Sequence, residues 1–279
     1  MASLQAKELV LTPGSDKREG RQALLVSVLV LSDPAVLTEE WGRMYTALAA
    51  QVARRLPRSS APILEVGCGQ GQFTIPLALS ATGIEIVAVD SYRGHYANGR
   101  QKLLATLQGK GLAGQVAVKR SEALRWLRRQ RVPVFQAVVS SEFLPEVTTA
   151  EMREFFRECF HAILPGGTTV HVYLSSTPRN RAQRLVITGD SNPRWTRHPP
   201  REWFSPPSPI ARASLEEAGF LRVRVAKVQV RVRLVRAAAV QQLERWGVRR
   251  AFARENGIDR GLRAIELPDW IVLSGVKPS

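Results

Sequence analysis

One stretch of the sequence limits the possible folds more than any other: Pro62–Leu79, which reads PILEVGCGQGQFTIPLAL. The apolar run Ile63–Val66, typical of a buried strand, leads into Gly67, Gly69 and Gly71, and a helix-like apolar run follows. A glycine-rich turn between a strand and a helix lets a ligand approach free backbone N–H groups, because glycine has no side chain to keep it away. The stretch therefore predicts a ligand-binding strand–turn–helix unit.

Strand-like and helix-like segments alternate after this turn. Four apolar runs indicate buried strands: IEIVAVD (84–90), QVAVKR (115–120), VFQAVVSS (134–141) and TTVHVYL (168–174). Helices are expected near 95–108, 121–130 and 148–164, the last beginning with a capping box of Thr148 and Glu151 and ending at LPGG. Such alternation is typical of parallel βαβ units. It predicts an α/β fold with a doubly wound, mostly parallel seven-stranded sheet.

The remaining segments predict an extension and two inserts. Residues 1–58 form an N-terminal extension, with a hairpin or edge strand and then a helix. Residues 59–279 form the ligand-binding domain, with inserts at 175–209 and 236–265 after strands five and six. The first insert has no clear period, and a loop of that length is usually functional or mobile.

A strand-rich segment and a closing strand complete the predicted sheet. In FLRVRVAKVQVRVRLV (220–235), apolar residues change phase at Ala226–Lys227, which predicts a bulge or a bend. A helix is expected before it, over Ser208–Ala218, and a basic helical region after it, over 236–254. DWIVLSGVK (269–277) is expected to close the sheet.

The net charge, the length of the apolar runs and the cysteines limit the cellular environment and the kinds of partner that this protein can have. The formal net charge is +16, and the 40 basic residues are 33 Arg and 7 Lys. This excess indicates a polyanionic partner such as nucleic acid, or else genome composition or adaptation to heat. No apolar run reaches the roughly 20 residues of a membrane helix. Cys68 and Cys159 have no metal-ligand neighbours, so we expect no disulfide, no metal site and a cytoplasmic location without a signal peptide.

The glycine spacing excludes two common nucleotide sites. A dinucleotide fingerprint, G-x-G-x-x-G, would need a third glycine at position 72, which is Gln72. A P-loop would need Gly-Lys-Ser/Thr, which does not follow. The glycines instead run G-x-G-x-G, with Glu65 two residues before the first.

These motifs resemble those of the Rossmann-like (class I) S-adenosylmethionine-dependent methyltransferase family. LEVGCGQG is similar to the first motif of the family. The other similar segments follow in the family's order: VAVD ending at Asp90, RSEAL (120–124), FQAVVSSEFLPEV (135–147), ILPGG (163–167) and SLEEAGF (214–220). The resemblance covers about Pro62–Phe220, and it implies methyl transfer with S-adenosyl-L-methionine as cofactor.

The resemblance also implies a set of cofactor-binding residues: Glu65, Gly67, Cys68, Gly69, Gly71, Asp90, Ser91, Ser121, Glu122 and Ser140. Glu65 would order the loop near the amino-acid tail, and Asp90 would accept hydrogen bonds from both ribose hydroxyls. Glu122, or the backbone beside it, would meet the adenine. Each has a structural alternative: Gly67 a tight turn, Asp90 a helix cap, Glu122 a first-turn acid and Cys68 a packing residue.

Candidate catalytic groups lie near the predicted strand ends: Glu142, His171, Tyr173 and His198. Each has a structural alternative, such as a core histidine at 171 or a cap or ion pair at Glu142. Aromatic residues could wall an acceptor pocket or cover the cofactor, or could instead pack the core: Trp195, Trp203, Phe204, Trp41 and Tyr45.

The residues at the end of the predicted fourth strand limit the class of molecule that accepts the methyl group. It ends in SSEF, not in the Asn/Asp-Pro-Pro-Tyr/Phe of base-amino methyltransferases. The segment SSEFLPEV (140–147) instead resembles that of enzymes acting on small molecules, which implies a small-molecule acceptor at O, N, S or activated carbon. Two alternatives stay open, an RNA or ribonucleoprotein methyltransferase, favoured by charge, and a non-catalytic cofactor-binding module. The sequence leaves the oligomeric state and any general base undecided.

Overall fold

The computed structural model describes residues 12–13, 24–25, 29–93, 97–130, 132–197 and 201–279. Its contacts divide the chain into two compact units. The sheet unit comprises Ala35–Ser176, Pro200–Val225 and Ile271–Ser279, and the insert unit comprises Met1–Pro34, Thr177–Pro199 and Ala226–Trp270. The domain boundary expected at residue 58 stays a prediction.

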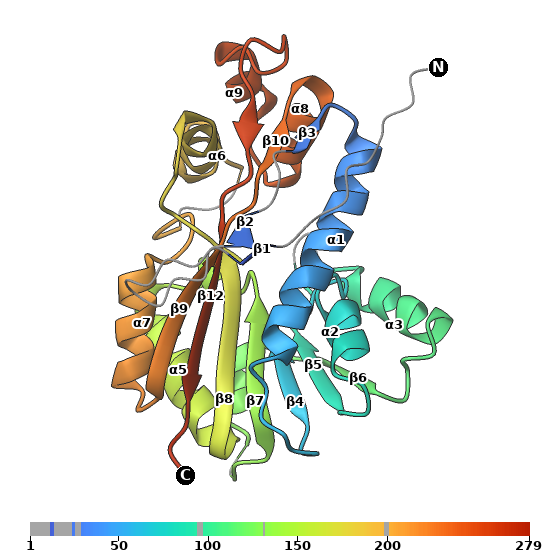
Figure 1. Ribbon diagram of the computed structural model, residues 1–279, viewed down its shortest axis with the longest axis vertical. Helices are drawn as coiled ribbons and strands as arrows, with labels where there is room; N and C mark the ends of the chain where they lie inside the picture. The colour runs from blue at the N-terminus through green and yellow to red at the C-terminus, as the bar shows by residue number, and fades with distance from the viewer. Residues whose placement is uncertain (1–11, 14–23, 26–28, 94–96, 131, 198–200) are drawn as a thin grey trace. The chain divides into compact units, whose positions relative to one another are not determined.

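The sheet unit is built on the expected seven-stranded sheet, in the order β6-β5-β4-β7-β8-β12-β9 (Figure 1). Its strands are β4 (Ile63–Val66), β5 (Ile86–Asp90), β6 (Val116–Arg120), β7 (Phe135–Ser141), β8 (Ile163–Leu174), β9 (Leu221–Val228) and β12 (Trp270–Val276). β4 runs parallel to β5 and β7, and the pairs β5–β6 and β7–β8 are also parallel. The Lys277 N–H, just after β12, donates to Gly167 near the start of β8, so these two strands run in opposite directions. The mostly parallel seven-stranded fold is confirmed.

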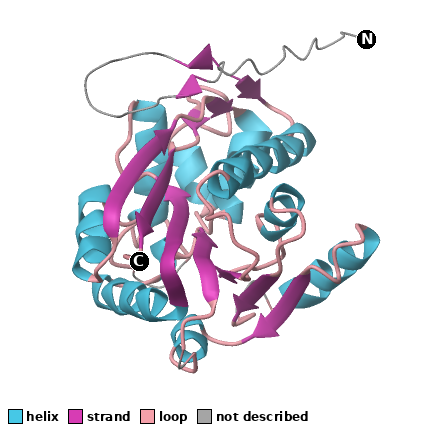
Figure 2. Ribbon diagram, turned by 60° about the horizontal axis from the view of Figure 1, so that its bottom comes forward, coloured by secondary structure: helices cyan, strands magenta, loops and turns pink. Residues whose placement is uncertain are grey.

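Helices cover the sheet, as Figure 2 shows in cyan. They are α1 (Pro34–Ala53), α2 (Thr74–Ser80), α3 (Gly99–Gly109), α4 (Ala123–Leu127), the 3₁₀ turn η2 (Leu144–Glu146), α5 (Thr149–Ala162) and α7 (Ser208–Glu217). α5 contacts both α4 and α7, so these three form one layer. α5 begins with the expected capping box, in which Thr148 Oγ1 accepts from the Glu151 N–H at 3.3 Å and Glu151 Oε2 accepts from the Thr148 N–H at 2.8 Å.

The central strand β4 is buried at all four positions, as expected for a parallel strand covered on both faces. The main core lies between the sheet and the layer of α4, α5 and α7, and contains Phe155, Phe156 and Phe220. A fully buried phenylalanine of this kind contributes about 3–5 kcal/mol relative to alanine.

The expected turn at ILPGG (163–167) lies inside strand β8. α5 ends at Ala162, and β8 begins at Ile163 rather than at 168. Phe135 pairs with Ile163 whereas Ala137 pairs with Thr168, so β8 uses three extra residues between these two pairs. The prediction of a turn that separates helix and strand was therefore wrong: the Pro-Gly-Gly segment forms an irregularity within the strand, which is the usual place for such residues inside a sheet.

The insert unit contains a three-stranded sheet, in which β10 (Val232–Leu234) pairs antiparallel with β11 (Ile265–Glu266) and parallel with β3 (Leu29–Leu31). β1 (Thr12–Pro13) and β2 (Leu24–Leu25) pair antiparallel. The helices are α6 (Arg181–Ser191), α8 (Arg236–Arg245) and α9 (Arg250–Glu255). The latter two confirm the helical region expected over 236–254.

Two expectations about this unit needed correction. The segment 175–209 is not without regular structure, because α6 begins where Asn180 Oδ1 accepts from the Gln183 N–H at 3.0 Å. The change of phase at Ala226–Lys227 is not a bulge within one strand: β9 ends at Val228, and β10 belongs to another sheet. The alternation changes phase because the chain passes from one core to another.

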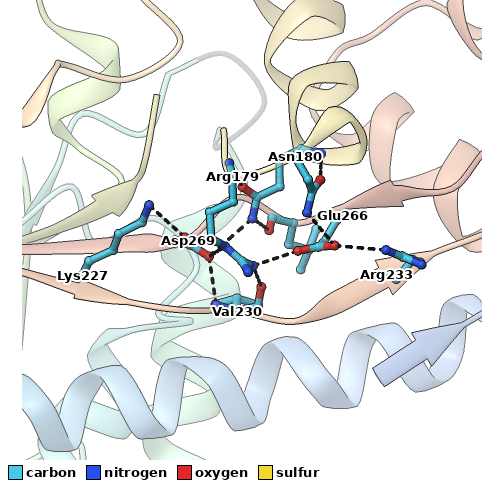
Figure 3. A network of polar contacts seen from close by, with 9 residues as sticks. Arg179, Asn180, Lys227, Val230, Arg233, Glu266 and Asp269 are labelled. Atoms are coloured by element: carbon cyan, nitrogen blue, oxygen red, sulfur yellow. Dashed lines mark hydrogen bonds and ion pairs between the residues drawn. The ribbon is translucent and has the colours of Figure 1, made fainter. Parts of the chain in front are cut away.

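A buried ionic network, the Arg179 network, joins α6, β10 and β11 of the insert unit (Figure 3). Arg179 donates to both oxygens of Asp269, at 3.0 and 2.9 Å, to Glu266 Oε1 at 2.8 Å and to the Val230 carbonyl at 3.0 Å. Lys227 lies 3.0 Å from Asp269. Asp269 is 0% exposed and Glu266 4%, so both carboxylates depend on these cations for the solvation that water does not supply.

Across the described ranges, no helix is both long enough and apolar enough to span a bilayer.

Candidate functional site

The glycine turn adopts the backbone conformation that only glycine enters without strain. Gly67, Gly69 and Gly71 have φ angles of +77°, +49° and +86°. At Gly71, a Cβ atom would lie 2.3 Å from Leu103 Cδ1 of α3. The third glycine therefore serves the packing of the turn against α3, in addition to any ligand.

Asp90, at the carboxyl end of β5, holds the turn in place. Its Oδ2 accepts from the Gly69 N–H at 2.9 Å, and its Oδ1 accepts from the Tyr92 N–H at 2.6 Å. Asn98, and not Asp90, is the N-cap of α3, the next helix that the structure describes. Each carboxylate oxygen has a second lone pair, so Asp90 can also accept from two hydroxyl groups of a ligand.

Glu65 is the third of the four residues of β4, two residues before the first glycine, and is 1% exposed. Burial raises the pKa of its carboxyl group to about 8, and the nearby charge of Asp90 acts in the same direction. Its Oε2 makes no hydrogen bond of standard geometry among the described residues, although the nearby Thr74 hydroxyl lowers the pKa of Glu65 in part. Buried polar atoms nearly always have a partner, so this oxygen indicates a place for a donor or cation of a ligand.

Cys68 and Tyr92 form a buried pair beside this turn. The Cys68 Sγ and Tyr92 Oη atoms are 3.2 Å apart. Burial raises the pKa of both groups above their ordinary values, so thiol and phenol stay protonated. This geometry supports the packing role for Cys68. Tyr92 was not among the predicted site residues, although an aromatic residue just after an acidic strand end was a signal for it.

The three residues expected around the ribose and adenine, Ser91, Ser121 and Glu122, line one cavity of about 370 Å³. Glu122 is the residue before α4, but its side chain makes no capping hydrogen bond. Its Oε1 instead lies 3.0 Å from Arg93 Nη1. The structure thus brings these predicted residues together at the ends of β5 and β6.

The same cavity is lined by four arginines that were not predicted as site residues: Arg93, Arg120, Arg125 and Arg129. The dense arginines between 120 and 131 were visible in the sequence. Nothing in the sequence alone showed which of them face a common cavity.

At the end of β7, Glu142 connects two strands. Its N–H donates to the Val172 carbonyl at 2.8 Å, and its Oε1 accepts from the Leu174 N–H at 2.8 Å. Its φ of +57° is unusual for a residue other than glycine. Such a conformation costs on the order of 1–3 kcal/mol and is frequent at functional sites, so Glu142 stays a candidate.

His171 and Ser140 pair with each other inside the core. His171 Nδ1 lies 2.8 Å from Ser140 Oγ, and its Nε2 lies 2.6 Å from Thr169 Oγ1. The His171 ring also packs against Phe155 and Phe156. Burial lowers the pKa of His171 to about 3, so the ring is neutral at pH 7. Complete burial weighs against contact of these two side chains with substrate or cofactor, and those roles stay predictions.

The remaining candidates are distributed over both units. Tyr173 is 0% exposed and belongs to the core beneath α5, and burial raises the pKa of its phenol. His198 lies outside the described residues. Trp203 packs against the core of the sheet unit, whereas Trp195 stacks on Phe252 within the insert unit.

The comparisons with known proteins agree with this geometry. Residues 63–167 match the family model described as "Methyltransferase domain". No curated protein matches the chain. The fold resembles that of S-adenosylmethionine-dependent methyltransferase SibL, with 16% identity and a TM-score of 0.58, over 87% of this chain and 57% of that one.

Two further solved structures share the fold. One is Haemonchus contortus phosphoethanolamine N-methyltransferase 2 in complex with S-adenosyl-L-methionine, with 13% identity and a TM-score of 0.54, over 84% of this chain and 53% of that one. The other is the [4+2]-cyclase SpnF, with 16% identity and a TM-score of 0.56, over 84% and 80%. The chain thus spans little more than half the length of SibL and the N-methyltransferase.

The seven-stranded sheet, the glycine turn and Asp90 define a Rossmann-like nucleoside-binding unit. Residues 63–167 match a methyltransferase domain, and the fold resembles that of S-adenosylmethionine-dependent methyltransferases, the class whose cofactor is S-adenosylmethionine.

Proposed function

We propose that this chain transfers a methyl group from S-adenosylmethionine to a small-molecule acceptor. The observation that carries the proposal is the junction of β4, the glycine turn and β5, where Asp90 fixes the turn and the buried Oε2 of Glu65 makes no hydrogen bond of standard geometry within the described ranges. A small-molecule acceptor is further supported by the phosphoethanolamine N-methyltransferase that shares the fold.

The residues of the junction fit the chemistry of this cofactor. When bound, S-adenosylmethionine supplies a methyl group activated by a positively charged sulfur. The carboxyl group of Glu65 suits the cationic amino group of the tail, because a cation nearby favours ionisation of a buried acid. Asp90 suits the two ribose hydroxyls as a bidentate acceptor. Ser121 and Glu122 wall the cavity expected to take the adenine.

The protein's part in methyl transfer is to position the acceptor and exclude water, and to remove a proton only if the acceptor carries one. Glu142 is the candidate for contact with the acceptor, since it directly follows β7 and has a strained conformation. One of its oxygens already accepts from the Leu174 N–H. We expect it to orient the acceptor rather than to act alone as a base.

Two other functions remain candidates. An RNA or ribonucleoprotein acceptor is favoured by the net charge of +16. A cofactor-binding module without methyl transfer is favoured by the likeness to SpnF, whose structure is described as that of a [4+2]-cyclase, because a fold does not by itself determine a reaction.

The first experiment is calorimetric titration with S-adenosylhomocysteine, using protein freed of nucleic acid. Asp90→Ala should weaken binding by about 1.5–3 kcal/mol, the usual cost of losing a charged hydrogen-bond acceptor. The matched control is Asp259→Ala, which removes an exposed aspartate of the insert unit. Thermal unfolding of each variant separates loss of binding from loss of fold. Unchanged affinity in Asp90→Ala would remove Asp90 from the site.

Acceptor class is tested with cofactor labelled in its methyl group. The protein is incubated with the low-molecular-weight fraction of a cell extract and, separately, with RNA. Label in small molecules supports the main proposal, and label in RNA supports the second function. If the protein binds S-adenosylhomocysteine but labels neither fraction, the third function is favoured.

A further inference from the structure

The cavity at the ends of β5 and β6 has a strong excess of positive charge. Its four arginines, Arg93, Arg120, Arg125 and Arg129, face one carboxylate, that of Glu122. The cavity volume of about 370 Å³ falls within the roughly 300–1,000 Å³ of small-molecule sites. Like charges that share a cavity repel one another, so this arrangement favours an anionic ligand.

Among the residues that the structure describes, only one of the four guanidinium groups has a partner. Arg93 pairs with Glu122 at 3.0 Å. The side chains of Arg120, Arg125 and Arg129 make no hydrogen bond or ion pair within the described part of the chain. The neighbouring Arg128 pairs with Glu154 and does not line the cavity. An acidic partner is therefore available to Arg128 in this segment, whereas the three cavity arginines have none among the described residues.

The three unpaired arginines are held on adjoining elements. Arg120 ends β6, opposite Asp90 of β5. Arg125 lies in α4, and Arg129 follows four residues later, where its N–H donates to the Trp126 carbonyl at 3.2 Å and continues the turn. Residues four apart on a helical turn project to the same side. The backbone thus directs three guanidinium groups toward a common ligand.

We propose that this cavity binds a phosphate-bearing ligand, with Arg120, Arg125 and Arg129 donating to phosphate oxygens. The planar guanidinium group offers paired N–H donors that match the spacing of phosphate oxygens. S-adenosylmethionine carries no phosphate, and its adenine is expected at the Ser121 and Glu122 wall of the same cavity, so the three arginines serve a second ligand bound beside the adenine. The phosphate comes from an RNA backbone or from a small phosphorylated molecule, and the inference does not depend on methyl transfer.

The experiment compares two double variants that remove equal charge. Arg125→Gln/Arg129→Gln removes two cavity arginines. Arg128→Gln/Arg212→Gln removes two exposed arginines that pair with acids outside the cavity, Glu154 and Glu216. The probes are a fluorescein-labelled single-stranded RNA, followed by anisotropy over a range of salt, and pyrophosphate, followed by calorimetry. Thermal unfolding checks that both variants keep their fold.

We expect the cavity variant to bind its probe about tenfold or more weakly, and the control less than about threefold, because only cavity arginines contact phosphate. If RNA is the ligand, the plot of log affinity against log salt concentration should also become less steep by about 1.4. This is the change expected when two contacts to the phosphates of a single strand are lost. Pyrophosphate that binds the wild type and displaces RNA would identify a phosphate group as sufficient. RNA binding that pyrophosphate does not compete with would identify the polymer.

Two results would overturn the inference: equal weakening in both double variants, which would mean a general effect of charge, or a wild-type protein that binds neither probe. Arg120→Gln, measured alone, provides a second test at the end of β6. Titration with S-adenosylhomocysteine in the same preparations keeps the two proposals apart. A folded protein that binds pyrophosphate or RNA but not S-adenosylhomocysteine would contradict the proposed function and leave this inference standing.

Discussion

Two clusters of basic residues in this protein are alike in sequence and opposite in structure. In the insert unit, Arg179 is surrounded by the buried carboxylates of Glu266 and Asp269. In the sheet unit, Arg120, Arg125 and Arg129 face a cavity without a carboxylate partner within the described residues. The difference separates two uses of arginine: a matched, buried arginine stabilises a fold, whereas unmatched arginines around a cavity remain available to a ligand.

The two clusters differ in the cost of losing one member. Removing one partner of a buried ionic group leaves the other charge without solvation, which costs several kcal/mol. An exposed arginine stays hydrated when its partner is lost, so its pair contributes little. The predictions below test this difference, from the largest expected effect to the smallest.

Arg179→Met should destabilise the protein by about 3–5 kcal/mol, because Lys227 would be the one cation left beside Asp269 and Arg233 the one cation left beside Glu266 among the described residues. The measurement is the free energy of unfolding in urea. Arg194→Met is the matched control in the same unit, since its pair with Glu255 is exposed on both sides. We expect a change below about 1 kcal/mol there. Equal effects in the two variants would remove the distinction between the clusters.

The second prediction concerns how stability depends on pH at His171, a buried residue that is neutral and hydrogen-bonded in the folded protein. Its pKa is lowered from 6.5 to about 3 in the folded state, so its contribution to stability is complete above pH 6.5 and is lost as pH falls toward 3. Between pH 7 and pH 4 this group should account for about 3 kcal/mol of lost stability. Urea unfolding of wild type and His171→Gln across this range measures the effect. Parallel pH profiles would contradict the prediction.

Glu65 tests a buried acid whose Oε2 makes no hydrogen bond of standard geometry in the described structure. Its pKa is raised from 4.5 to about 8 in the folded state, so relative stability is highest below pH 4.5 and is lost as pH rises through 8. Glu65→Gln removes this titration, and it should flatten the profile by about 2 kcal/mol between pH 4 and pH 6. Thermal unfolding at several pH values provides the measurement. A variant as pH-sensitive as the wild type would show that Glu65 already has a partner.

The smallest effect is expected for the cavity arginines. Arg125→Gln/Arg129→Gln should change the free energy of unfolding by less than about 1 kcal/mol, because both residues are exposed and unpaired where the structure describes them. Thermal unfolding of the variant and of the wild type measures this change in stability. Strong destabilisation would mean that these side chains support the fold, and it would remove the contrast with Arg179.

Much of the fold followed from local patterns. The alternation of apolar strands and helices predicted the parallel sheet, and Thr148 with Glu151 predicted the start of α5. These features depend on neighbours in the chain, so the sequence contains them directly. α6 was missed because its buried face includes polar residues such as Gln183 and Asp190, which hide the apolar period. Its one clear signal was the capping residue Asn180.

The candidate site was predictable only in part. The glycine turn, Asp90 and the residues before α4 lie at the ends of adjacent parallel strands, and order along the chain places such ends together. His171 and Ser140 follow the same rule of position, yet they pair inside the core, because alternate residues of a strand point to opposite faces.

The sequence by itself determined the class of fold, the glycine turn and the acidic ends of the strands, because each rests on periodicity or on backbone conformation within a few residues. Only the tertiary structure decided which charged side chains form ion pairs. Arg179 meets Asp269 across ninety positions of the chain, and Arg93 meets Glu122 across a pair of strands. Electrostatic pairing depends on distance in space and on burial, and neither quantity is written in the order of the residues.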